Sequence, residues 1–417
     1  MINHDVISVS GILAIPDCDL PVLGYGRSPL GYWVLFLESE KGTAASDIGL
    51  MMSAYTAAAL VGQYVFGYFS DKLLSLRVPV ALAAILFTAF VAAIPLLPNM
   101  TWLYPIMALV GFVQQPIGPM LDSWTLKHLS QHGQQIQFGR IRGFGSLGWA
   151  TTALMTAYLI LFVSWNMMFV VAVVAGLLLS ITALSIPDVV ESAPAKKEGQ
   201  PELTIGRAIA HLLRNSAYLY ILVVVFLMYL GVQTTFNFQG LLIKGAGGNV
   251  RELGWTYFFG ALSEIPAMLL SVWLLPRLAA RKLMVAAGCL YMLRYGLIIY
   301  FQTSWIIMLT ACLEGVAFGL LLTALRSYVF SVVAEDVLTS AMTVVDAVFL
   351  ALTVIVGGVV GGWIIEQYSV MHMLAACAVS SGLALLLLLL PGPKCVKNSL
   401  GLSRQPEELA SIETDRR

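Results

Sequence analysis

Long apolar runs recur along almost the whole chain, and short polar stretches separate them. Each run is long enough to cross the hydrocarbon core of a bilayer as a helix, which takes about 20 mostly apolar residues. The runs predict eleven membrane spans, at 47–70, 78–97, 100–124, 143–164, 166–186, 216–240, 254–275, 283–302, 304–330, 338–365 and 369–390. The pattern therefore predicts an all-α membrane protein.

A further span is expected ahead of these, but its pattern is weak. Charged residues and three prolines interrupt residues 11–37, and only GYWVLFLES, residues 31–39, is typical of the outer end of a helix. With this atypical first helix the chain has twelve transmembrane helices. The predicted divisions are an N-terminal six-helix half (1–186), a central loop (187–215), a C-terminal six-helix half (216–390) and a polar tail (391–417).

The placement of lysine and arginine predicts the orientation, because positive loops gather on the cytoplasmic side. If both chain ends lie on that side, the opposite side holds only Lys41, Lys244 and Arg251, and most other loop charges are cytoplasmic. We therefore expect a multi-pass protein of the plasma or inner membrane, with the termini, the central loop and the tail in the cytoplasm.

Composition narrows the classes of function. Of the 417 residues, 59% are hydrophobic and 11% are charged, whereas soluble proteins carry about 25% charged residues. The formal net charge is zero, so nothing implies a nucleic-acid partner. The five cysteines show no metal spacing, and we find no nucleophile motif or phosphate loop. We therefore expect a protein that is not an enzyme and that has no metal or cofactor. We also expect it to lie in the lipid bilayer as a monomer and to bind a small-molecule substrate.

The loop after the span at 47–70 carries a spaced motif, GYFSDKLLSLR. Gly67, Asp71, Lys72 and Arg77 fit the pattern G-x-x-x-D-(R/K)-x-x-x-x-(R/K). Gly67 is expected to allow close helix approach. Asp71 is expected to accept hydrogen bonds at a neighbouring helix N-terminus, and the two bases to anchor the cytoplasmic face.

This motif resembles the loop 2–3 signature of the major facilitator superfamily. A weaker echo, LLPRLAARK at 274–282, occupies the equivalent loop of the second half. Such an echo fits two six-helix halves related by an internal repeat. The resemblance implies that the motif gates alternating access and does not touch substrate.

Ionisable residues inside the spans are costly, so each one marks a candidate pathway or coupling site. The seven of interest are Asp122, Glu264, Glu314, Asp346, Arg142, Arg294 and Arg326. Carboxylates exceed arginines by one, as expected if one carboxyl is protonated for part of a cycle. Arg326 and Asp346 are expected to pair as a buried structural bridge between the spans at 304–330 and 338–365.

Arg142 and Trp149 lie in FGRIRGFGSLGWA, residues 138–150. They are two helical turns apart and therefore on nearly the same face. A guanidinium and an indole there suit a hydroxyl-bearing ring, the first by hydrogen bonds and the second by stacking. The alternative for Arg142 is an interfacial anchor, although Arg140 already suits that position.

Glu264 and Arg294 lie in the middle of their spans. A carboxyl group in hydrocarbon favours its protonated form, which a proton carrier needs. Pro266 predicts an irregular helix after Glu264. Arg294 stays protonated and needs an anionic partner, for which Glu314 on the next span is the candidate. The alternative for all three charges is a purely structural role.

Taken together, residues 31–390 resemble the lactose-permease-like branch of the superfamily, which groups oligosaccharide:proton symporters. Nucleoside:proton symporters and the phenylpropionate permease group are close relatives. The resemblance implies that Arg142 and Trp149 hold the sugar and that Asp122 pairs with this arginine. The spacing between Asp122 and Arg142 is longer by two than in that branch.

The resemblance also implies roles in the second half. Asn237, in GVQTTFNFQG, lies where lactose permeases carry a charged residue, Glu264 resembles a glutamate that serves both sugar and proton, and Arg294 resembles the arginine that drives deprotonation. Glu314 replaces a histidine, and Ala317 replaces a glutamate. The proton relay is therefore expected to depend on Glu264 and Glu314.

The leading interpretation is a proton-coupled symporter that imports a small polar solute, a sugar or glycoside, by alternating access. The alternatives are a nucleoside or aromatic-acid:proton symporter, or a proton-driven exporter of sugars or drugs with the same fold. The predicted site consists of Asp122, Arg142, Trp149, Asn237 and Glu264 for substrate, Glu264, Arg294 and Glu314 for proton coupling, and Gly67, Asp71, Lys72 and Arg77 for gating.

Overall fold

A computed structural model describes residues 31–73, 75–97, 99–131, 138–185, 212, 215–333 and 337–391. Every regular element in this part of the chain is helical. Nine of the described helices are long and apolar enough to cross a membrane. The predicted all-α fold is confirmed. The predicted central loop and tail lie almost entirely outside the described residues, as does most of the predicted first span.

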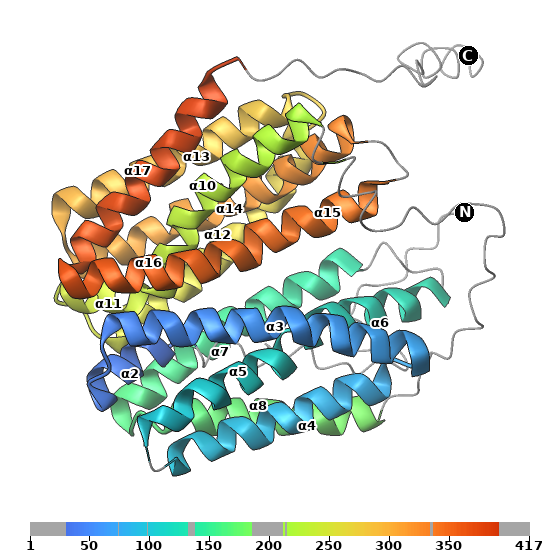
Figure 1. The fold of residues 1–417 in the computed structure, drawn as a ribbon, viewed down its shortest axis with the longest axis vertical. Helices are drawn as coiled ribbons and strands as arrows, with labels where there is room; N and C mark the ends of the chain where they lie inside the picture. Colours follow the sequence, from blue (N-terminus) through green and yellow to red (C-terminus); the bar gives the residue numbers. More distant parts are fainter. Residues whose placement is uncertain are drawn as a thin grey trace, which may run out of the picture.

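The N-terminal half forms one bundle, drawn in blue to green in Figure 1. Its helices are α2 (Trp33–Lys41), α3 (Ala45–Leu73), α4 (Arg77–Ala93), α5 (Leu103–Gln114), α6 (Ile117–Gln131), α7 (Phe138–Phe162) and α8 (Met167–Ser185). Helix α2 is the helical segment expected at 31–39, and Gly42 ends it in the left-handed conformation with φ of 62°. The span predicted at 100–124 is divided into α5 and α6 by a turn that contains Pro116.

The C-terminal half forms the second bundle, drawn in yellow-green to red (Figure 1). Its helices are α10 (Ser216–Asn237), α11 (Gln239–Gly245), α12 (Val250–Leu274), α13 (Ala280–Phe301), α14 (Ser304–Val332), α15 (Leu338–Asp346), α16 (Thr353–Gln367) and α17 (Val370–Leu389). A π-helical segment, η6 (Ala347–Leu352), joins α15 to α16. The prediction of an irregular helix at Pro266 was wrong, because α12 continues through this residue without a break.

Two arginine contacts show the same arrangement in each half. The Arg77 guanidinium, at the start of α4, donates to the carbonyl of Leu184 near the end of α8. The Arg281 guanidinium, at the start of α13, donates to the carbonyl of Leu388 near the end of α17, at 2.7 and 2.9 Å. Each bond satisfies a carbonyl at a helix C-terminus, and each spans 107 residues. This correspondence supports the expected internal repeat.

The two halves contact each other through α3 and α16, near the 42–44 loop. A Cβ on Gly49 would lie 2.8 Å from the carbonyl carbon of Gly358, and one on Gly358 would lie 2.7 Å from Ser53 Oγ. The Ser53 hydroxyl donates to Ile355 O at 2.9 Å. Glycines therefore allow the two backbones to touch.

A second contact between the halves, between α7 and α12, lies at the same end of the molecule. A Cβ on Gly254 would lie 2.5 Å from the Cβ of Ala157. The indole N–H of Trp255 donates to the Tyr158 hydroxyl at 3.3 Å. An ion pair between Lys244 of α11 and Glu38 of α2 adds a third link. The halves are thus joined at the end that carries the 42–44 loop.

Candidate functional site

Arg294 on α13 and Glu314 on α14 form a charge pair inside the bundle. The arginine Nη2 lies 2.8 Å from the glutamate Oε2, and their side chains are 1% and 13% exposed. Arg294 was expected to need an anionic partner, and the predicted partner is confirmed. In a low-dielectric interior, removing one of these two side chains would leave the other as a buried charge without a partner, which is strongly destabilising.

Glu264 lies on the helix that faces Glu314. Helices α12 and α14 pack closely at Gly315, where an added Cβ would lie 3.1 Å from the backbone nitrogen of Glu264. Glu264 is partly buried. Helix α14 packs against both α12 and α13, so these three helices carry two carboxylates and an arginine in the same part of the bundle.

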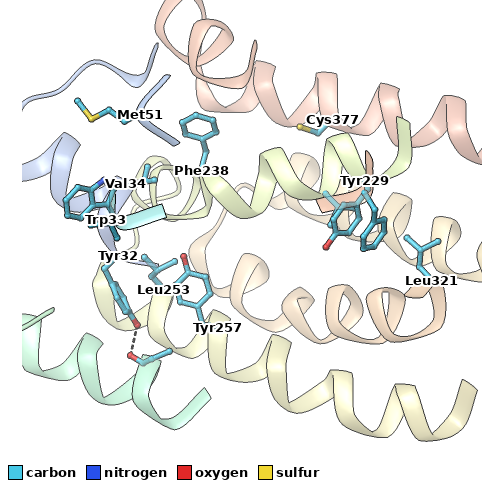
Figure 2. Packing of buried hydrophobic residues seen from close by; sticks show 14 of the residues in the cluster. Tyr32, Trp33, Val34, Met51, Tyr229, Phe238, Leu253, Tyr257, Leu321 and Cys377 are labelled. Atoms are coloured by element: carbon cyan, nitrogen blue, oxygen red, sulfur yellow. Dashed lines mark hydrogen bonds between the residues drawn. The ribbon is translucent and has the colours of Figure 1, made fainter. Parts of the chain in front are cut away.

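Tyr229 was not predicted from the sequence. Its ring stacks on Phe349 of η6, with centroids 3.7 Å apart and planes 14° apart, and it is 6% exposed. Figure 2 shows this residue among the apolar core. An aromatic residue in an apolar run predicts packing only, so the sequence carried no signal for this stacked contact between α10 and η6.

The end of α10 gathers buried amides. The Asn237 side chain is 9% exposed, and its oxygen accepts from Gln233 Nε2 at 3.4 Å. Gln239, the first residue of α11, is 1% exposed, and neither of its amide atoms has a hydrogen-bond partner among the described residues. A buried amide without a partner costs free energy. Gln239, two residues after Asn237, therefore has unused hydrogen-bonding capacity.

Trp149 lies on α7 against Tyr257 of α12, so the predicted stacking residue contacts the other half. Their ring centroids are 5.6 Å apart and the planes are inclined by 70°. Tyr257 also contacts Tyr32, with centroids 5.8 Å apart, and Figure 2 shows these two tyrosines together, with the Tyr32 hydroxyl bonded to a carbonyl. That carbonyl is Ala153 O, at 2.7 Å.

The predicted pairing of Asp122 with Arg142 stays a prediction. Asp122 is half-buried on α6. Arg142 lies on α7, two turns before Trp149 as expected. Its side chain is not among those that the structure describes, so the contact with Asp122 is not tested.

The bridge between Arg326 and Asp346 exists, but it is not buried as predicted. Arg326 Nη2 lies 2.6 Å from Asp346 Oδ1, and each side chain is 40% exposed. The sequence placed both residues in apolar runs but could not show that they turn to an open side of the bundle. Such an exposed pair contributes little stability, about 0–1 kcal/mol.

The motif expected to gate transport has one unexpected feature. A Cβ on Gly67 would meet no atom within 4 Å, whereas one on Gly62 would lie 2.9 Å from the Cα of Phe112. The close approach expected at Gly67 is therefore found at Gly62, one and a half turns earlier. Asp71 and Lys72 are exposed, and the side chain of neither has a hydrogen bond or ion pair with another described residue.

The site contains charged, amide and hydroxyl groups within a membrane bundle, which defines a class: a helical membrane protein with an internal polar site. The described residues hold no group of three or more His, Cys, Asp or Glu side chains that could bind a metal ion. Residues 28–376 match the model of the MFS_1 like family. The chain therefore belongs to the MFS_1 like family, and the predicted resemblance to the major facilitator superfamily is confirmed.

Two sequence relatives cover most of the chain. The maltose permease of Geobacillus stearothermophilus is 26% identical over 360 residues, which cover 85% of this chain and 88% of that one. The uncharacterized transporter YwbF of Bacillus subtilis (strain 168) is 23% identical over 318 residues, which cover 75% and 76%.

Two solved structures show the same fold. The nucleoside transporter NupG has a TM-score of 0.73 and 17% identity, and the match covers 88% of this chain and 96% of that one. A D-xylose-proton symporter has a TM-score of 0.67 and 14% identity, and the match covers 90% and 96%.

Proposed function

We propose that this protein is a proton-coupled secondary transporter that imports a small polar solute, a sugar or glycoside, by alternating access. The observation that carries this proposal is the ion pair of Arg294 and Glu314 inside the bundle, with Glu264 on the helix that packs against the helix of Glu314. Charges persist in a membrane interior where they have a task in transport. Membership of the family, and the similarity to a maltose permease, support a sugar as the solute.

The arrangement of the charges suggests the order of events. A proton neutralises Glu264 or Glu314, and solute then binds among Asp122, Arg142, Trp149 and the amides at the end of α10. With the charge neutralised, the loaded halves can reorient. Arg294 then favours the carboxylate form of the protonated glutamate, so this glutamate releases its proton.

The lysine and arginine bias assigns the 42–44 loop to the extracellular side. The contacts at Gly49, Gly358 and Gly254 then close the protein toward the outside. Such a state would exchange solute and proton with the cytoplasm.

A nucleoside remains the second candidate solute, because the fold matches that of a nucleoside transporter.

Uptake of radiolabelled maltose and uridine into right-side-out and everted vesicles tests the proposal. We expect accumulation of one solute in right-side-out vesicles, abolished by a protonophore. Glu264→Gln should lose accumulation, whereas Glu40→Gln, which removes an exposed carboxylate on α2, should keep it. Accumulation only in everted vesicles would indicate an exporter. Full accumulation by Glu264→Gln would exclude the role of Glu264.

A further inference from the structure

Tyr257 makes three contacts with the other half of the protein, to Gly31, Tyr32 and Trp149. It belongs to α12 of the C-terminal half and is 4% exposed. Its hydroxyl donates to the carbonyl of Gly31 in the N-terminal half at 2.8 Å. Its ring contacts Tyr32 and Trp149, both from the N-terminal half. Each of these contacts requires that the two halves are closed against each other at the 42–44 end.

Tyr257 also packs within its own half, where its ring lies 5.7 Å from that of Phe236 on α10. The same side chain therefore bonds to Gly31 across the closed interface and contacts the indole of Trp149.

We infer that Tyr257 is a positioning residue that couples closure of the extracellular end to the orientation of Trp149 at the solute site. The inference rests on the proposed function. When the halves separate on the extracellular side, the Tyr257–Gly31 hydrogen bond breaks and Trp149 loses its edge contact, so the indole is free to admit solute. When they close, the Tyr257 ring fixes the indole against the bound solute.

The two roles of Tyr257 can be separated with two variants. Tyr257→Phe keeps the ring and removes the hydrogen bond that stabilises closure. Loss of one net hydrogen bond should raise the outward-open fraction about two- to tenfold. Apparent KM for external solute should then fall by a similar factor while Vmax also falls. Tyr257→Ala also removes the support of Trp149, so its KM should rise. A loss of folded protein alone would lower Vmax and leave KM unchanged.

Tyr104→Phe is the matched control. It also removes a tyrosine hydrogen bond, to Asp47 at 2.8 Å, but both residues belong to the N-terminal half. We expect its KM to equal that of the wild type. A direct readout is the distance between spin labels at Glu40 and Tyr368, two exposed positions on opposite halves near the extracellular end, in a background without native cysteines.

The label distances should shift toward longer values in Tyr257→Phe and stay unchanged in Tyr104→Phe. Wild-type distances together with wild-type KM in Tyr257→Phe would overturn the inference, as would a fall in KM for Tyr257→Ala. Because the distance measurement needs no solute, it separates two failures. A wild-type protein that transports neither sugar nor nucleoside would overturn the proposed function, whatever the distances show.

Discussion

The contact between Gly49 and Gly358 gives a sharp prediction, because it leaves no space for a methyl group. A Cβ on Gly49 would lie 2.8 Å from the Gly358 carbonyl carbon and closer still to its oxygen, whereas ordinary contact begins at 3.4 Å. Helices α3 and α16 must therefore separate by more than about 0.6 Å to accept Gly49→Ala. The obstructing atoms are backbone, so no side-chain rotation can relieve the overlap.

The cost of this substitution falls on one conformation only. Overpacking a close contact costs about 1–3 kcal/mol, and this penalty disappears when the halves separate on the extracellular side. Such a difference shifts the balance between closed and open states about 5- to 150-fold. The gain in helix propensity from glycine to alanine, about 1 kcal/mol, is common to both states and cancels.

The assay combines the label distance between Glu40 and Tyr368 with initial rates of uptake. Gly49→Ala should lengthen the distance, lower the apparent KM for external solute and lower Vmax. Gly296→Ala is the control, since a Cβ there would meet no atom within 4 Å, and it should behave as the wild type. If Gly49→Ala also keeps the wild-type distance distribution and kinetics, then this contact does not form the closed state.

Two further changes test the charged residues. Glu314→Gln leaves Arg294 buried without the counter-charge of Glu314, which costs about 3–5 kcal/mol. We expect a lower thermal midpoint, with partial recovery in the Arg294→Gln/Glu314→Gln double variant. A midpoint equal to that of the wild type would refute the buried pair. Asp346→Asn breaks the half-exposed pair with Arg326 and should lower the free energy of unfolding by no more than about 1 kcal/mol. Denaturant titration in detergent measures this free energy. A decrease of several kcal/mol would show that the pair is buried in the membrane-embedded protein.

Much of the fold follows from the chain's apolar periodicity. The predicted spans at 216–240 and 304–330 correspond closely to α10 and α14, because length and hydropathy alone fix where a helix must cross hydrocarbon. The single span predicted at 100–124 is two helices instead, because the turn at Pro116 interrupts it. The continuous path of α12 through Pro266 was not visible in the sequence, because neighbouring helices in a membrane bundle allow a proline within a helix that local propensity disfavours.

The candidate site was only partly predictable. Arg294 and Glu314 could be paired from the sequence because a buried guanidinium must have an anion and the next span offers one. The exposure of Arg326 and Asp346 depends on which face of each helix points inward. The places of Gly49, Tyr229 and Tyr257 depend on residues of distant helices, including some in the other half of the chain. Their neighbours in sequence are apolar and indicate only packing.

If solute and proton cross together through Glu264 and Glu314, a gradient of solute should drive movement of protons, and this movement can be measured. Purified protein is reconstituted in proteoliposomes under weak buffer, and an inward gradient of the transported solute is applied without a membrane potential. We predict alkalinisation of the outer medium, lost in Glu264→Gln but kept in Glu40→Gln. Entry of solute at the wild-type rate with no change in external pH would contradict the account.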